Sequence, residues 1–134
     1  MSERDVQNMR AGYEAFSRGD TDWLSKFLHP DFRYRSREEL PGGGEYEGRR
    51  AFDQRLAELT ELFADINFEP KEFLESGPYV LVTVGWSAIG RGGGVRIAQE
   101  LVHVWRMQDG HALGLQVFSD KATALEAVVV GLSE

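Results

Sequence analysis

The sequence predicts an α+β domain whose helices cover one face of a curved antiparallel β-sheet. Two changes of pattern along the chain carry this prediction. Up to about residue 65, apolar residues recur at every third or fourth position, which is typical of helices with one buried face. Over about the next fifty residues they alternate with polar residues, as in half-buried strands, and the short connections favour an antiparallel meander.

The chain has 134 residues, with 15 Lys and Arg against 22 Asp and Glu and a formal net charge of −7. This length suits one domain, to which we assign residues 1–134. The acidic balance argues against nucleic acid as a partner. Cysteine is absent, which excludes disulfides, thiolate metal sites and cysteine nucleophiles. No metal-binding or phosphate-binding motif is present, so we expect neither a metal nor a cofactor.

The apolar stretches are all much shorter than the roughly 18 residues of a membrane-spanning helix, so we expect no membrane association. The charged N-terminal residues lack the apolar segment of a secretion signal. Together these features predict a cytoplasmic protein.

Two helices and a strand are predicted near the N-terminus. The first helix covers Val6–Phe16, and Gly19-Asp20 ends its pattern. A short second helix presents Trp23 on its apolar face and ends before Pro30, because the residue preceding a proline avoids the helical conformation. Alternation over Phe32–Arg37 then predicts a strand with a basic outer row.

The rest of the chain is predicted to contain a long third helix, four strands and a closing helix. Before the third helix, the loop Glu38–Glu47 is either a lid over the mouth of the pocket or a disordered connection, and both remain open. Asp109-Gly110 is a strong signal for a tight hairpin. The predicted elements are a helix over Gly48–Asp65, strands at Asn67–Glu75, Tyr79–Ile89, Val95–Met107 and His111–Phe118, and a helix over Lys121–Leu132.

This order of elements resembles the ketosteroid isomerase and nuclear transport factor 2-like superfamily. The motifs that carry the resemblance are Gly19-Asp20, Trp23 and Phe27–Phe32, while Gly48–Phe52, Val104–Gly110 and Ser119–Ala127 are similar to its SnoaL-like polyketide cyclase branch. The resemblance implies a cone-shaped fold, in which a curved antiparallel sheet wraps around three N-terminal helices and a short C-terminal helix follows. It also implies a deep pocket and, commonly, a dimer. The superfamily includes isomerases, cyclases, epoxide hydrolases, dehydratases and binding modules, so the pocket must decide the function.

Strand alternation predicts which side chains line such a pocket, and they are mostly apolar and aromatic. We therefore expect a small, mostly apolar ligand. The predicted ligand-binding residues are Trp86, Trp105, Ser36, Gln99, Val84, Val117 and Trp23.

The acidic residues of the superfamily are absent from the matching positions. The resemblance places the base of the steroid isomerases at Ser36 and their tyrosine at Gly12. It places the arginine and two aspartates of the epoxide hydrolases at Val84, Trp86 and Val117. A carboxylate is thus missing from each position that would need one.

His103 is the candidate acid or base, because its ordinary pKa lies near neutrality and its strand position faces inward. Tyr13 or Tyr34 would act as hydrogen-bond donor. One hypothesis is cofactor-free acid–base chemistry of the isomerase, cyclase or dehydratase type. The alternative is a non-catalytic binding or dimerisation module, in which His103 is a buried histidine with a structural partner. Asp120, the local candidate for the acid of the cyclases, fits the N-cap of the last helix better.

The outer face of the sheet is the expected interface of a homodimer or, as the alternative, a surface that recognises another protein. The residues predicted to form it are Arg96, Ala98, Val102, Val104, Gln116 and Phe118.

Overall fold

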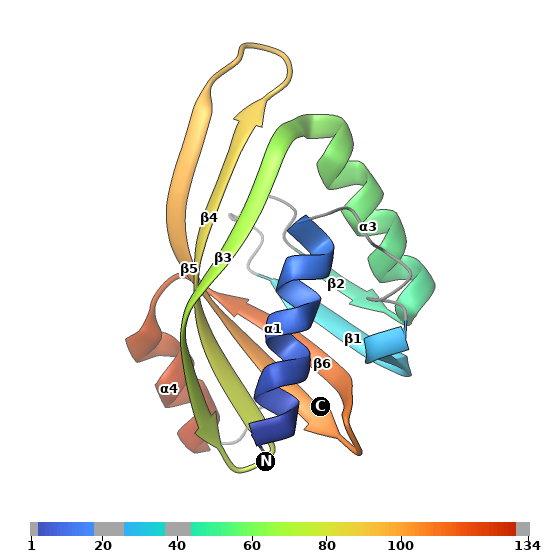
Figure 1. The fold of residues 1–134 in the computed structure, drawn as a ribbon, viewed down its shortest axis with the longest axis vertical. Coiled ribbons are helices and arrows are strands. Elements are labelled where there is room, and N and C mark those ends of the chain that lie inside the picture. Colours follow the sequence, from blue (N-terminus) through green and yellow to red (C-terminus); the bar gives the residue numbers. More distant parts are fainter. Residues whose placement is uncertain (1–2, 18–25, 37–43, 131–134) are drawn as a thin grey trace.

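The computed structural model describes residues 3–17, 26–36 and 44–130. A strongly twisted sheet forms its centre, with α1 and α3 over one face and α4 against the other (Figure 1). The strand order is β2-β1-β6-β5-β4-β3. In chain order the elements are α1 (Glu3–Ser17), β1 (Leu28–Ser36), β2 (Gly44–Glu47), α3 (Arg49–Leu62), β3 (Phe63–Ser76), β4 (Tyr79–Gly90), β5 (Arg96–Gln108), β6 (His111–Phe118) and α4 (Lys121–Val130).

The sheet is mixed, so the prediction of a purely antiparallel sheet is wrong at one pair of strands. β1 lies parallel to β6, with Tyr34 opposite Leu115. The other neighbouring strands are antiparallel. Part of the predicted loop Glu38–Glu47 forms β2, which pairs with β1, and residues 37–43 lie outside the described part of the chain.

The third helix ends earlier than its apolar spacing predicts. Phe63 lies four residues after Leu59, as a helical residue would, yet its backbone is extended and begins β3 directly. Phe63 pairs with Gly90 of β4, and this pairing in the sheet outweighs the local helical pattern. Asp65 takes a positive φ of 51° where the register between the two strands shifts.

The predicted second helix falls largely on residues 18–25, which lie outside the described residues, as does Trp23. Lys26 and Phe27 are helical, and Leu28 already begins β1. Pro30 therefore lies inside a strand and is not the residue that ends the helix.

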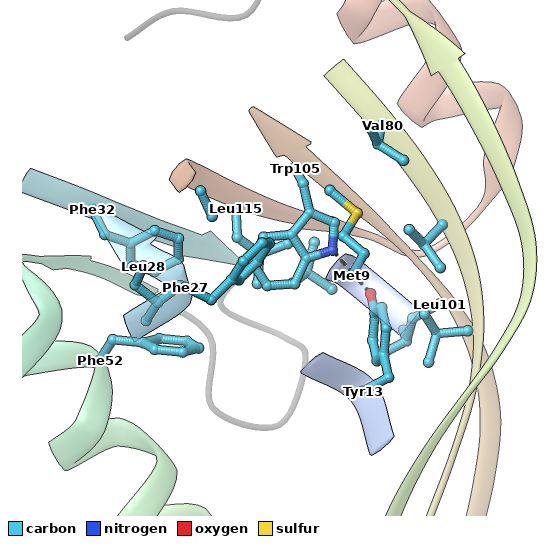
Figure 2. Packing of buried hydrophobic residues seen from close by; sticks show 14 of the residues in the cluster. Met9, Tyr13, Phe27, Leu28, Phe32, Phe52, Val80, Leu101, Trp105 and Leu115 are labelled. Carbon is cyan, nitrogen blue, oxygen red and sulfur yellow. Dashed lines mark hydrogen bonds between the residues drawn. The ribbon is translucent and has the colours of Figure 1, made fainter. Parts of the chain in front are cut away.

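The main core lies between the two helices and the inner face of the sheet. Trp105 of β5 is at its centre, and the ring of Phe27 lies 5.8 Å from it between centroids. Met9 and Tyr13 reach it from α1 (Figure 2). The predicted alternation is confirmed on β4 and β5, because Val82, Val84, Trp86, Leu101, His103, Trp105 and Met107 are all buried on this side.

A second, smaller core lies on the outer face of the sheet, beneath α4. Val102 and Val104 are buried there against Ala124 of the helix. Asp120 caps this helix, as predicted, by accepting a hydrogen bond from the backbone N–H of Thr123 at 2.8 Å. Two residues of the expected dimer patch, Val102 and Val104, are therefore covered by the chain itself, and the prediction that they are exposed is wrong.

Candidate functional site

A cavity of about 110 Å³ lies between α1, α3 and the inner face of the sheet. An engineered cavity of roughly 150 Å³ holds a benzene molecule, so this space is on the scale of one ring. Its wall consists of Met9, Gly12, Tyr13, Phe16, Phe27, Tyr34, Phe52, Arg55, Leu56, Leu59, Phe68, Trp86, Leu101, His103, Trp105, Leu115 and Val117. The wall is mostly apolar and aromatic, and its few polar groups are the ones that would orient a ligand.

Three of these polar side chains form a buried hydrogen-bonded chain. The indole N–H of Trp105 donates to the hydroxyl oxygen of Tyr13 at 2.9 Å, as the facing atoms in Figure 2 show. The same hydroxyl lies 2.7 Å from Nδ1 of His103. Helix α1 and strand β5 are thereby joined at the cavity.

The chain of hydrogen bonds favours one tautomer of His103. An indole N–H is only a donor, so Tyr13 must accept from Trp105 and has its own proton left to donate. Among the described residues, Nδ1 of His103 is the acceptor within reach of that proton. A neutral His103 that accepts at Nδ1 carries its proton on Nε2, where no described residue accepts it.

Burial keeps both groups uncharged. It lowers the pKa of His103 to about 4, because the apolar surroundings disfavour the imidazolium. Burial also raises the pKa of Tyr13 far above its ordinary value, although the hydrogen bond from Trp105 opposes this change. At neutral pH the pair is therefore a neutral phenol and a neutral imidazole.

Aromatic rings fix the orientation of the imidazole. The ring of Tyr13 stacks on His103 with centroids 5.8 Å apart and planes 13° apart. Phe68 of β3 lies 5.7 Å away from His103 on the same centroid measure. Phe68 also stacks on Trp86, whose Nε1 is buried and has no hydrogen-bond partner among the described residues. Trp86 thus adds a second unused donor to the site.

The structure gathers six of the ten predicted site residues around one cavity. Those in the wall are Tyr13, Tyr34, Trp86, His103, Trp105 and Val117. Val84 is buried but contributes nothing to the wall. Gln99 of β5 is exposed and contributes nothing to the wall. The backbone of Ser36 pairs with Val117, but its side chain and all of Trp23 lie outside the described part of the chain.

Arg55 is a cavity residue that the sequence reasoning missed. It lies three residues after Phe52 and four before Leu59, on the apolar face of the third helix, and it is only 5% exposed. A charged residue that interrupts such a face was the available signal. Within the described residues, the cavity wall contains no Asp or Glu, so Arg55 is its one permanent charge.

Across the described residues, no three His, Asp or Glu side chains are grouped closely enough to hold a metal ion. No described helix has the length and apolarity needed to cross a membrane.

Comparison with known proteins agrees with this fold. The sequence profile of the SnoaL-like domain matches residues 9–113. No curated protein sequence gives a significant match. An NTF2-like protein of unknown function from Burkholderia pseudomallei K96243 has a similar structure, with a TM-score of 0.78 and 27% sequence identity over 94% of this chain and 97% of that one.

Two more distant structures share the fold. TerC, co-crystallised with polyporic acid, has a TM-score of 0.78 and 22% identity over 96% of this chain and 100% of its own. A putative SnoaL-like polyketide cyclase from Jannaschia sp. CCS1 has a TM-score of 0.77 and 16% identity over 99% of this chain and 98% of that one. The profile match spans most of the chain and the fold agrees with it, so this protein belongs to the SnoaL-like family and has the NTF2-like α+β fold.

Proposed function

We propose that this protein binds a small, mostly apolar molecule that carries an oxygen acceptor such as a carbonyl group. The observation that carries the proposal is the chain from Trp105 through Tyr13 to His103, which leaves the Nε2 proton of His103 without a described acceptor beside an apolar cavity. A donor in such surroundings binds an oxygen strongly, because no water competes for it. The cavity volume of about 110 Å³ favours a ligand with one ring.

Each of the three hydrogen-bonded residues has its own part in this proposal. His103 contacts the ligand and polarises its oxygen. Tyr13 and Trp105 are positioning residues, because they hold the imidazole in the tautomer that donates through Nε2. Tyr34 completes the wall from β1.

The geometry favours binding over proton abstraction. His103 is neutral, and Nδ1, the nitrogen that could take up a proton, already accepts a hydrogen bond from the hydroxyl of Tyr13. The described wall offers no carboxylate as an alternative base. Any chemistry at this site would therefore begin from a carbonyl polarised by a neutral imidazole, with His103 as electrophile rather than as base. The missing carboxylate equally favours the second candidate, a binding module without catalysis. TerC, crystallised with polyporic acid, is a precedent for a molecule bound to this fold.

The proposal is tested with two probes of matched shape, acetophenone and isopropylbenzene, which differ in whether they carry an oxygen. We expect acetophenone to bind about fivefold more tightly, the value of one neutral hydrogen bond. The ¹³C resonance of its carbonyl should move downfield on binding. In His103→Leu both differences should vanish while isopropylbenzene still binds, and His111→Leu, at an exposed position on β6, should behave as the unchanged protein.

Equal binding of the two probes by the unchanged protein would overturn the role of His103. Failure of both probes to bind, with the protein folded, would overturn binding in this cavity altogether.

A further inference from the structure

One glycine lies in the helices that cover the cavity. Gly12 is in the interior of α1, and no other glycine occurs in the described helices α1, α3 and α4. Gly12 is buried and forms part of the cavity wall. Among the described wall residues it is the one without a side chain. The wall therefore has a gap in its side chains at this position.

The helical repeat directs position 12 toward the cavity. Met9 lies one turn before it and Phe16 one turn after it, and both belong to the wall. Residues three and four positions apart share one face of a helix, so a side chain at position 12 would extend from the same face between them. The next residue, Tyr13, carries the hydroxyl that contacts His103. Gly12 therefore leaves its space on the turn of α1 that also supplies the hydrogen-bonded hydroxyl.

Glycine is an unfavourable residue for α1 if only the stability of the helix matters. In a helix interior it is less favourable than alanine, because its flexible backbone loses more conformational freedom on folding. Alanine would also bury a methyl group against the apolar wall. Position 12 would therefore be filled more favourably by alanine if it only had to support the helix.

The cavity is small enough for one methyl group to change what it holds. Its volume is about 110 Å³, below the roughly 150 Å³ of an engineered cavity that holds benzene. A methyl group is about as large as a water molecule, whose share of the liquid is about 30 Å³. A methyl group at position 12 would thus take roughly a quarter of the space. A ring that fits beside Gly12 would be strained beside alanine.

Resting on the binding function proposed above, we propose that Gly12 is a specificity-determining residue, which makes room for the ring of the ligand. The ring lies against the bare backbone of Gly12, while the carbonyl oxygen accepts the hydrogen bond from His103. Because Gly12 adjoins the residue that orients His103, the ring and the oxygen lie close together in the ligand. The inference thus assigns the ligand to compact ketones whose single ring is joined directly to the carbonyl carbon.

Acetophenone and 2-butanone test this assignment in the unchanged protein and in Gly12→Ala. Both carry a carbonyl oxygen that His103 can contact, but only acetophenone has a ring. Gly12→Ala should weaken acetophenone binding at least about fivefold, because an added methyl group strains a filled cavity. The affinity for 2-butanone should stay within about twofold. Titrations followed by NMR measure both ligands.

Thermal unfolding without ligand supplies a second, opposite effect. The midpoint of Gly12→Ala should rise by about 4 °C, since alanine favours the helix interior. The matched control is Gly92→Ala, which adds the same methyl group in the exposed turn between β4 and β5, with nothing within 4 Å of it. This control should change neither the midpoint nor the affinity for either ketone.

Unchanged acetophenone binding in Gly12→Ala would overturn this inference and leave the binding function standing. A lower unfolding midpoint in that variant would also overturn it, because Gly12 would then be required for packing. Equal losses of affinity for the two ketones would count against a role in size selection in the same way. Failure of acetophenone to bind the unchanged protein would overturn the binding function together with this inference.

Discussion

The hydroxyl of Tyr13 and Nδ1 of His103 lie 2.7 Å apart although the two residues are 90 positions apart in the chain. Tyr13 also accepts from Trp105, so a single hydroxyl satisfies two buried groups. Among the described polar contacts, this is the pair that couples the packing of α1 to the protonation state of the cavity.

Tyr13→Phe should lower the free energy of unfolding by about 1–3 kcal/mol, because both His103 and Trp105 lose their partner in an apolar interior. Urea denaturation followed by far-UV circular dichroism measures the change. The matched control is Tyr46→Phe at a half-buried position, which should stay within about 0.5 kcal/mol of the unchanged protein. Equal effects of the two substitutions would contradict the role given to the Tyr13 hydroxyl.

The pKa of His103 predicts a loss of stability in acid. Burial lowers the pKa of the folded state to about 4 from the ordinary 6.5 of the unfolded chain. Between these values the unfolded chain binds more protons, so stability is complete above about pH 6.5 and falls as the pH falls toward 4. The loss amounts to at most ~3 kcal/mol.

His103→Gln isolates this contribution, since the carboxylates titrate alike in both proteins. Denaturation at about pH 7 and about pH 4.5 should show a larger loss in the unchanged protein than in the variant. Parallel losses would mean that His103 is readily protonated in the folded state.

The two tryptophans of the cavity should respond differently to truncation. Trp105 donates to Tyr13, whereas Nε1 of Trp86 is buried without a described partner. Trp105→Phe should therefore destabilise the protein by about 1–2 kcal/mol more than Trp86→Phe, in which an unsatisfied group is removed. Denaturation curves measured side by side decide this, and a Trp86 variant as unstable as the Trp105 variant would contradict it.

A homodimer through the outer face of the sheet remains our prediction. That face carries a groove of about 280 Å³ whose wall includes Arg33, Arg35, Arg106 and Gln116. A two-fold dimer brings the same patch of both protomers together. A positive charge added to this patch therefore lies near the same added charge on the partner, and the two repel each other. Sedimentation of the unchanged protein should show a dimer. Gln116→Arg should shift it toward monomer, whereas Gln54→Arg, at an exposed position of α3, should not. A monomer at micromolar concentration in the unchanged protein would contradict the prediction.

Much of the cavity wall could be predicted from the alternation of apolar and polar residues along the strands, because a strand with one buried face fixes the direction of every side chain along it. His103, Trp105 and Trp86 were placed inward on this basis and are found there. Alternation does not show which of the inward positions are covered. Gln99 shares the inward phase of His103 but is exposed, whereas Ile97, in the same phase, packs against the core.

The order of the strands could not be predicted from local pattern. Antiparallel neighbours joined by tight turns were expected and are found for β3 to β6. The parallel pairing of β1 with β6 has no local signal, since it joins two segments far apart in sequence. Arg55 could not be predicted as a cavity residue for a related reason, because helical periodicity shows which face is buried but not which of its positions meet a cavity.

The parallel pairing of β1 with β6 also determines when the protein can fold. The hairpins of β3, β4 and β5 join segments that are neighbours in sequence and can form quickly, because closing a short loop restricts the chain little. β1 can pair only after the last strand, β6, has been made. The contact of Tyr13 with His103 of β5 also closes a long loop of the chain. During synthesis we therefore expect the meander to assemble first, with β1 docking onto it only after β6 has left the ribosome.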